Sequence, residues 1–164
     1  MTLDEYLGQD TQGRRILVVS DMSKGQALLR NFEKKTGRMV HNVTCLTLDE
    51  IARSLFMYIQ ARGGYKSEYE LIDDTAASAL LREVFREHKS FMQYLKNEKI
   101  LNGRTTNEIT RMLQLIRADG WKSEEELNDR LRDVLHLNDW FVEKLEEKKL
   151  LDRVALKQYV LDVL

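Results

Sequence analysis

The sequence has few of the residues that build disulfides, metal sites or membrane spans. It contains one cysteine, three histidines and no proline in 164 residues. Cys45 alone excludes an internal disulfide and fits a reducing compartment, so we expect a cytoplasmic protein. The scattered His41, His88 and His136 make no metal-ligand spacing. With no long apolar run, we expect neither a signal peptide nor a bilayer-spanning segment. The lack of proline suits a mostly helical chain.

Charge is nearly balanced overall but unevenly spread along the chain. The formal net charge is −1 at pH 7, and 32% of the residues are charged. Residues 1–66 hold ten Lys/Arg against seven Asp/Glu, a net charge of +3, and residues 67–164 hold sixteen against twenty, a net charge of −4. A protein held to nucleic acid by charge alone would be far more basic. The charge is therefore compatible with phosphate contacts but does not argue for them.

Only two segments have the pattern of β-strands. Arg15–Ser20 is largely apolar, and Asn42–Leu46 contains the β-branched Val43 and Thr44. Both are short apolar runs, typical of strands buried on two faces in a parallel sheet. A predicted helix between them makes a βαβ unit. Because two strands do not make a self-sufficient sheet, we expect this region to be part of a larger α/β domain.

The rest of the chain has clear signals for the start of helices. Thr47 and Glu50 have the spacing of a capping box, and apolar residues follow at helical spacing until Gly63-Gly64. Further helix starts are predicted at Asp73, Ser90, Thr105, Ser123, Asn138 or Asp139, and Asp152. The predicted fold class is therefore α/β and predominantly helical: a small two-stranded parallel βαβ unit with a helical insertion.

The sequence lacks the machinery for ATP hydrolysis. No GxxxxGK[ST] segment is present to hold the β- and γ-phosphates with its backbone and lysine. Asp73-Asp74 resembles a pair of magnesium-binding acids, but Thr75 continues directly into a helical pattern, which favours a helix cap over a metal site. We therefore expect no catalytic residues, and no ATPase activity from this chain.

Four side chains follow the two strands and are candidates for binding an anion. Ser20, Ser23 and Lys24 come after the first strand, where the loops of open α/β sheets bind ligands. Thr47 comes after the second strand, at the start of a helix. All four could donate hydrogen bonds to a phosphate. The alternative is a helix cap with a solvated lysine, and residue chemistry alone favours it for the first loop; Thr47 has the same two interpretations.

Three other residues favour structural interpretations. Trp121 and Trp140 are interpreted as anchors of helical packing, although an exposed tryptophan could stack on a base. Cys45 lies inside a predicted strand and fits a small buried residue better than a nucleophile. No Ser/His/Asp or Cys/His arrangement stands out.

Five segments follow one another in an order that resembles a known family. They are "RILVVSDMSKGQALLRNF", "TCLTLDEIARSLF", "YELIDDTAASALLREVF", "NEITRMLQLIRADGWKSEE" and "FVEKLEEKKLLDRVALKQYVLDVL". The first two resemble motifs Ia and Ib of UvrD/Rep-type superfamily 1 DNA helicases and of the helicase-like subunits of AddAB-type helicase–nucleases. The next two are similar to the helical 1B subdomain of these proteins, and the last to the return into subdomain 1A. The resemblance covers about residues 14–164.

The resemblance implies an organisation and a set of DNA-binding residues. Residues 1–66 would be a partial 1A-like α/β unit, 67–149 a helical 1B-like insertion, and 150–164 a helix returning to 1A. In the family, motifs Ia and Ib touch single-stranded DNA. The residues that fall on polar positions of these motifs, and would hold the phosphate backbone, are Ser20, Ser23, Lys24 and Thr47.

The chain also departs from the family pattern. Asp21 stands where motif Ia has an aromatic residue, and Leu48-Asp49 stand where motif Ib has an aromatic–histidine pair. In the last motif Asp152 is kept, but Arg153 and Ala155 replace an aromatic residue and a second acid. These losses remove base-stacking groups and leave mainly phosphate contacts.

We therefore expect a non-catalytic DNA-binding portion of a helicase or helicase–nuclease in DNA repair or recombination, without the Walker A and B motifs. Its implied partners are single-stranded DNA and either the remaining helicase subdomains or a partner helicase–nuclease subunit, with no membrane. This chain itself would need no cofactor, and ATP and Mg would belong to a complete parent helicase. The alternative is a helicase-derived protein–protein interaction or scaffold module without nucleic-acid binding, favoured by the near-neutral charge and the lost aromatic residues.

Overall fold

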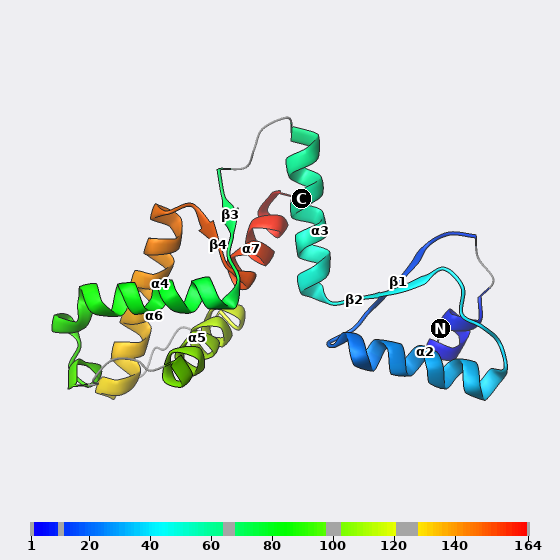
Figure 1. Cartoon of the computed structure of the whole chain (residues 1–164), viewed down its shortest axis with the longest axis horizontal. Coiled ribbons are helices and arrows are strands. Elements are labelled where there is room, and N and C mark those ends of the chain that lie inside the picture. Colours follow the sequence, from blue (N-terminus) through cyan, green and yellow to red (C-terminus); the bar gives the residue numbers. More distant parts are fainter. Residues whose placement is uncertain (1, 10–11, 64–67, 98–102, 121–127, 164) are drawn as a thin grey trace. The chain divides into compact units, whose positions relative to one another are not determined.

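The computed structural model describes residues 2–9, 12–63, 68–97, 103–120 and 128–163. The chain divides into two compact units, Met1–Arg62 and Gly63–Leu164 (Figure 1). Within the described residues the chain is predominantly helical and contains two small parallel strand pairs, which confirms the predicted fold class. The assignment of its parts to helicase subdomains stays a prediction.

The first unit contains the predicted βαβ arrangement. Its elements are α1 (Leu3–Gly8), β1 (Arg15–Val18), α2 (Met22–Thr36), β2 (Val43–Leu46) and α3 (Leu48–Gly63). Strands β1 and β2 pair in parallel, with Arg15 opposite Val43 and Val18 opposite Leu46. Helix α2 ends at Gly37, whose positive φ of 68° suits a glycine cap and whose N–H donates to the Glu33 carbonyl at 2.8 Å.

Helix α2 packs closely on one face of the β1–β2 pair. A Cβ atom on Gly25 would lie 2.9 Å from Cys45 Sγ and 3.1 Å from Val19 Cγ1, so only glycine allows this approach. The opposite face carries Ile16 and Val18, which are 52% and 53% exposed. The expectation that both faces of these strands are buried is therefore wrong, and Thr44 of β2 is exposed as well: side chains alternate along a strand, and one alternate set faces away from α2.

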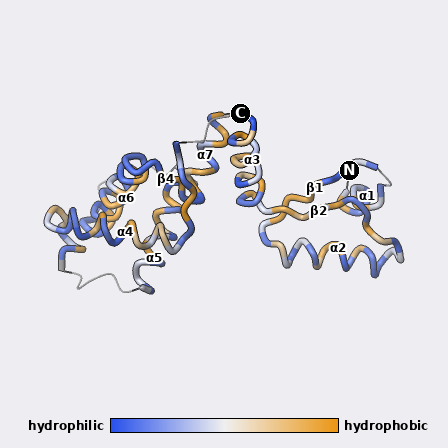
Figure 2. The backbone as a smooth tube through the Cα atoms, turned by 45° about the horizontal axis from the view of Figure 1, so that its top comes forward, coloured by the Kyte–Doolittle hydropathy of each residue, from blue (hydrophilic) through white to orange (hydrophobic). Residues whose placement is uncertain are grey.

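The hydrophobic character of both strands is nevertheless plain. Figure 2 colours most of β1 and β2 as hydrophobic. Leu17 lies opposite Cys45 in the register, and these two side chains face α2. Cys45 is 5% exposed, which confirms its interpretation as a small buried residue.

The second unit is built mainly from helices. Its elements are β3 (Glu70–Leu71), α4 (Asp74–His88), the 3₁₀ turns η1 (Lys89–Phe91) and η2 (Leu95–Asn97), α5 (Gly103–Ala118), α6 (Asp129–Glu147), β4 (Leu150–Leu151) and α7 (Arg153–Val163). Strands β3 and β4 pair in parallel over two residues each, a feature that the sequence analysis did not predict. The core lies where α4, α5 and α6 meet, and includes Leu81, Val84, Leu113, Leu137 and Phe141.

Two predicted helix caps in this unit are confirmed. Asp73 Oδ1 accepts a hydrogen bond from Ala76 N at 2.8 Å at the start of α4. Asp152 Oδ1 accepts from Val154 N at 3.2 Å and Ala155 N at 2.9 Å at the start of α7. Both carboxylates satisfy N–H groups that have no partner within the helix.

Other predicted helix starts need correction. Helix α6 is continuous and is capped by Asn128, so a start at Asn138 or Asp139 is wrong: its buried residues keep helical spacing through that point. Helix α5 begins at Gly103, two residues before the predicted Thr105. Ser90 lies inside the 3₁₀ turn η1 rather than at the start of an α-helix. The predicted start at Ser123 lies outside the described residues.

Across the described ranges, no helix combines the length and the apolar character that crossing a membrane requires.

Candidate nucleic-acid interface

The parallel register brings the candidate residues to one edge of the β1–β2 pair. Val18 lies opposite Leu46 in the last register pair, and Val19 N donates to the Leu46 carbonyl at 2.9 Å. Ser20 and Thr47 follow these residues directly, so both leave the pair at its carboxyl edge. Since α2 begins at Met22, Ser23 and Lys24 lie in its first turn beside the same edge.

The N-terminus of α2 is occupied by a carboxylate of the chain itself. Asp21 Oδ1 accepts hydrogen bonds from Ser23 N at 2.7 Å and Lys24 N at 3.3 Å, and also from the Ser23 hydroxyl. The Ser23 hydroxyl and these backbone donors lower the pKa of Asp21 below its ordinary value. Asp21 is thus ionised at neutral pH and is the helix cap, which is the alternative that the residue chemistry favoured for this loop.

The N-terminus of α3 carries the predicted capping box. Thr47 N and Oγ1 donate to Glu50 Oε2 at 2.7 and 2.9 Å, and Glu50 N donates to Thr47 Oγ1 at 3.3 Å. This reciprocal arrangement confirms the cap role of Thr47. It also places a second carboxylate at the edge that the candidate residues share.

Three of the four candidates are exposed to solvent, and one of these three already uses its side-chain donor. Ser20 and Lys24 are exposed, while Thr47 is half-buried and the exposed Ser23 gives its hydroxyl proton to Asp21. An exposed lysine ammonium and a serine hydroxyl offer a phosphate one charge-assisted hydrogen bond and one neutral hydrogen bond. The edge can therefore contact a phosphate through side chains, whereas backbone donors at the two helix starts are already engaged: Asp21 accepts from Ser23 N and Lys24 N, and Thr47 Oγ1 accepts from Glu50 N.

The structure bears on one of the two tryptophans and on possible metal-binding groups. Trp140 is half-buried, packs against the core of the second unit, and stacks on His88 with ring centroids 4.3 Å apart, which confirms a packing role. Trp121 lies outside the described residues. In the described part of the chain, no group of three or more His, Cys, Asp or Glu side chains has the arrangement of a metal site.

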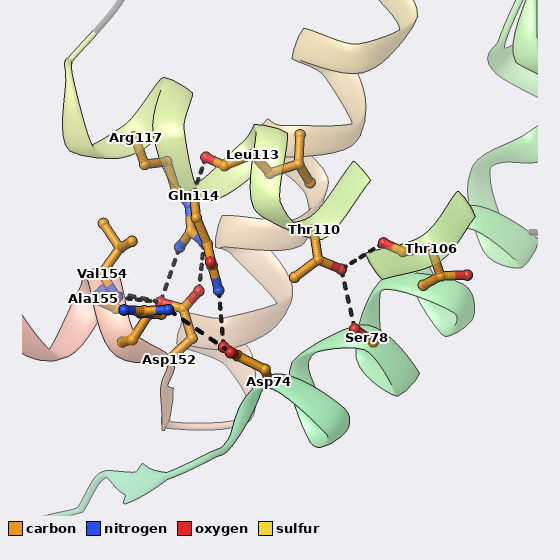
Figure 3. A network of polar contacts seen from close by, with 11 residues as sticks. Asp74, Ser78, Thr106, Thr110, Leu113, Gln114, Arg117, Asp152, Val154 and Ala155 are labelled. Atoms are coloured by element: carbon orange, nitrogen blue, oxygen red, sulfur yellow. Dashed lines mark hydrogen bonds and ion pairs between the residues drawn. The ribbon is translucent and has the colours of Figure 1, made fainter. Parts of the chain in front are cut away.

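Asp152, which the sequence analysis aligned with the acid of the last helicase motif, has a structural role in the second unit. Besides capping α7, it pairs with Arg117, whose Nη1 lies 3.2 Å from Asp152 Oδ1. Arg117 also donates through Nε to the Leu113 carbonyl at 3.4 Å (Figure 3). The Asp152 side chain is 1% exposed, so its charge is balanced inside the protein rather than by water.

Asp133 is a second buried carboxylate that the sequence analysis missed. Its oxygens accept hydrogen bonds from the backbone N–H groups of Gln93 (3.0 Å), Tyr94 (2.7 Å) and Leu95 (2.8 Å). Burial raises the pKa of Asp133, but the three backbone donors outweigh it and hold the pKa below its ordinary value. The available signal was an acid on the apolar stripe of α6, four residues before Leu137.

Comparison of the chain with models of known protein families gives no match, and comparison with curated proteins gives none. The helicase resemblance therefore stays a prediction that rests on the motifs.

Proposed function

We propose that this chain is a non-catalytic DNA-binding portion of a superfamily 1 helicase or helicase–nuclease that acts in DNA repair or recombination. The observation that supports this proposal is the common edge at which β1 and β2 place Ser20 and Thr47, with the exposed Lys24 beside it. We further propose that the protein works in the cytoplasm, in keeping with its single buried Cys45.

In this proposal, single-stranded DNA is held by its phosphates rather than by its bases. Lys24 supplies the charge and Ser20 a hydroxyl donor, while Thr47 and Ser23 contribute only by releasing Glu50 and Asp21. Because one ammonium lies among two carboxylates, the contact is weak and sensitive to salt. ATP, Mg and the remaining helicase subdomains or a partner subunit would come from the parent assembly.

Binding of the 164-residue chain to a fluorescent oligothymidine at low salt tests this proposal. Lys24→Ala is expected to weaken binding. Lys34→Ala is the matched control, because Lys34 is also exposed, lies on the same helix and carries the same charge, but is near the far end of α2. Equal loss in both variants would show that net charge, not this edge, attracts the DNA.

A second candidate function is a helicase-derived protein–protein module without a nucleic-acid role. It is favoured by the exposed apolar face of β1, where Ile16 and Val18 are each more than half exposed. Asp21 and Glu50 also favour it, since they occupy the helix N-termini that would otherwise attract phosphate. Undetectable binding of the oligothymidine at low salt would support this function over the first.

A further inference from the structure

A polar slot lies between α4 and α5 in the second unit. Its volume is about 280 Å³. Helix α4 lines it with Thr75, Ser78 and Arg82, which share one face at spacings of three and four residues. Helix α5 lines it with the facing polar side chains Asn107, Thr110, Arg111 and Gln114.

The described residues of this unit also line a second cavity that differs from the slot in size and in chemistry. This second cavity is a mainly apolar groove of about 490 Å³, lined by residues of α6, β4 and α7, among them Val142, Leu150 and Val154. The slot between α4 and α5 is the smaller of the two, at about 280 Å³. It is large enough for a tetrahedral oxyanion with an attached group, since liquid water occupies about 30 Å³ per molecule.

Hydrogen bonds fix how the two helices face each other across the slot. Ser78 Oγ lies 3.1 Å from Asn107 Oδ1 and 3.3 Å from Thr110 Oγ1, and Gln114 Nε2 donates to Asp74 Oδ1 at 3.2 Å. Figure 3 shows Ser78 and Thr110 pointing toward each other and Gln114 pointing toward Asp74. The helices are thus antiparallel, so Arg82 lies toward the end of the slot where Gly103 begins α5.

The charges that line the slot are mainly positive. Arg82 and Arg111 both line it, and Asp74 is its only acid among the described lining residues. Asp74 lies at the opposite end, where it accepts from Gln114 and lies 3.8 Å from Arg153 Nη1. The first turn of α5 lies at the Arg82 end of the slot, which Gly103 lines. Backbone N–H groups and the helix dipole at a helix start favour an anion.

One donor at this end has no partner. Arg82 Nε is buried and makes no hydrogen bond within the described part of the chain. Leaving a buried donor of a charged group unsatisfied is costly, so such a group calls for a ligand, an ion or water. An oxyanion in the slot would pair with the Arg82 guanidinium and with Arg111, the two cations that line it among the described residues.

We propose that the α4–α5 slot binds a phosphate group. Arg82 and Arg111 supply the charge and the hydrogen-bond donors, while Ser78 and Thr110, whose hydroxyl protons go to Asn107 Oδ1 and the Thr106 carbonyl, fix how the two helices face each other. This site lies in the second unit and does not depend on the strand edge of the first. The phosphate can be a free anion, a terminal monoester or a nucleic-acid diester, because all three present the same oxygens.

Titration of the full chain with inorganic phosphate, followed by amide resonances in two-dimensional NMR, tests this proposal. Saturable shifts are expected at Ser78 and Asn107. Arg82→Gln and Arg111→Gln should each weaken phosphate binding about tenfold or more, since each removes a charged donor. Arg86→Gln is the matched control, because Arg86 is exposed on the same helix and does not line the slot.

The outcomes separate a specific site from general charge attraction. The proposal is overturned if phosphate causes no saturable shift in the folded wild type, or if Arg86→Gln weakens binding as much as Arg82→Gln. If Arg82→Gln does not fold, the exposed Arg111 still decides the matter through Arg111→Gln. Competition with oligothymidine, with and without a 5′-phosphate, then assigns the source: displacement by both indicates a diester, by the phosphorylated one alone a monoester, and by neither a free anion.

Discussion

Arg117 Nη1 lies 3.2 Å from Asp152 Oδ1, between side chains that are only 11% and 1% exposed. The pair joins α5 to the start of α7, where Asp152 also accepts from the N–H groups of Val154 and Ala155. The Arg117 guanidinium in turn lies 5.3 Å from the centre of the Phe141 ring on α6. This buried ion pair therefore connects α5 to the start of α7 and, through the Arg117 guanidinium, contacts α6.

Removal of this carboxylate should strongly destabilise the protein. Asp152→Ala leaves the Arg117 charge buried without its partner, so we expect the free energy of unfolding to fall by about 3–5 kcal/mol. Urea denaturation followed by circular dichroism measures this change. Arg104→Ala is the control, because it breaks an exposed pair with Glu108 and should cost about 1 kcal/mol or less. Equal losses in the two variants would contradict a structural role for the buried pair.

The packing of α2 on β2 predicts that a single methyl group destabilises the first unit. Gly25→Ala would place Cβ 3.0 Å from Cys45 Cβ, and overpacking of this kind costs about 1–3 kcal/mol. The better helix propensity of alanine offsets about 1 kcal/mol of that cost. Gly8→Ala is the control in the same unit, since its Cβ would make an ordinary 3.8 Å contact with Phe32. Thermal unfolding should show a lower midpoint for Gly25→Ala than for Gly8→Ala.

Asp133 predicts how stability depends on pH in acid. Its pKa is lowered in the folded protein, so its contribution is complete above the unfolded pKa of about 3.9 and is lost as the pH falls through the lower folded pKa. Asp133→Asn should therefore be less stable at neutral pH, and the difference from wild type should shrink below about pH 4. Unfolding free energies measured from pH 7 to pH 2 check this. A difference that stays constant over this range would show that the charge of Asp133 is not involved.

Local signals in the sequence were sufficient for much of this fold. The apolar runs before Ser20 and Thr47 predicted two parallel strands, and short polar residues predicted the caps at Asp73 and Asp152. These features depend on residues only a few positions apart, so periodicity and capping patterns record them.

The remaining features depend on distant residues. Arg117 and Asp152 are 35 positions apart, and the sequence around either residue does not predict that the two side chains pair. The β3–β4 pair has two residues in each strand, too few for a periodic pattern. At the candidate site, the sequence predicted which residues share an edge, but not that Asp21 would take the donors of Ser23 and Lys24.

The competing carboxylate at the α2 N-terminus gives a prediction of its own. Asp21→Asn keeps a good helix cap but removes the negative charge beside Lys24, so affinity for oligothymidine should rise. Asp119→Asn makes the same change of net charge at an exposed position in the second unit. Fluorescence anisotropy at low salt compares the two variants. If both raise the affinity equally, the gain comes from net charge and not from the strand edge.

The salt dependence of single-stranded DNA binding tests the central claim most directly. Dissociation constants for oligothymidine are measured over a range of salt concentrations for wild type, Lys24→Ala and Lys34→Ala. A phosphate held by Lys24 predicts weaker binding for Lys24→Ala, and a log–log slope reduced in magnitude by about 0.7, the value for one contact to a single strand. Lys34→Ala should retain the wild-type slope. Undetectable binding at low salt, or an unchanged slope in Lys24→Ala, would contradict DNA binding at this edge.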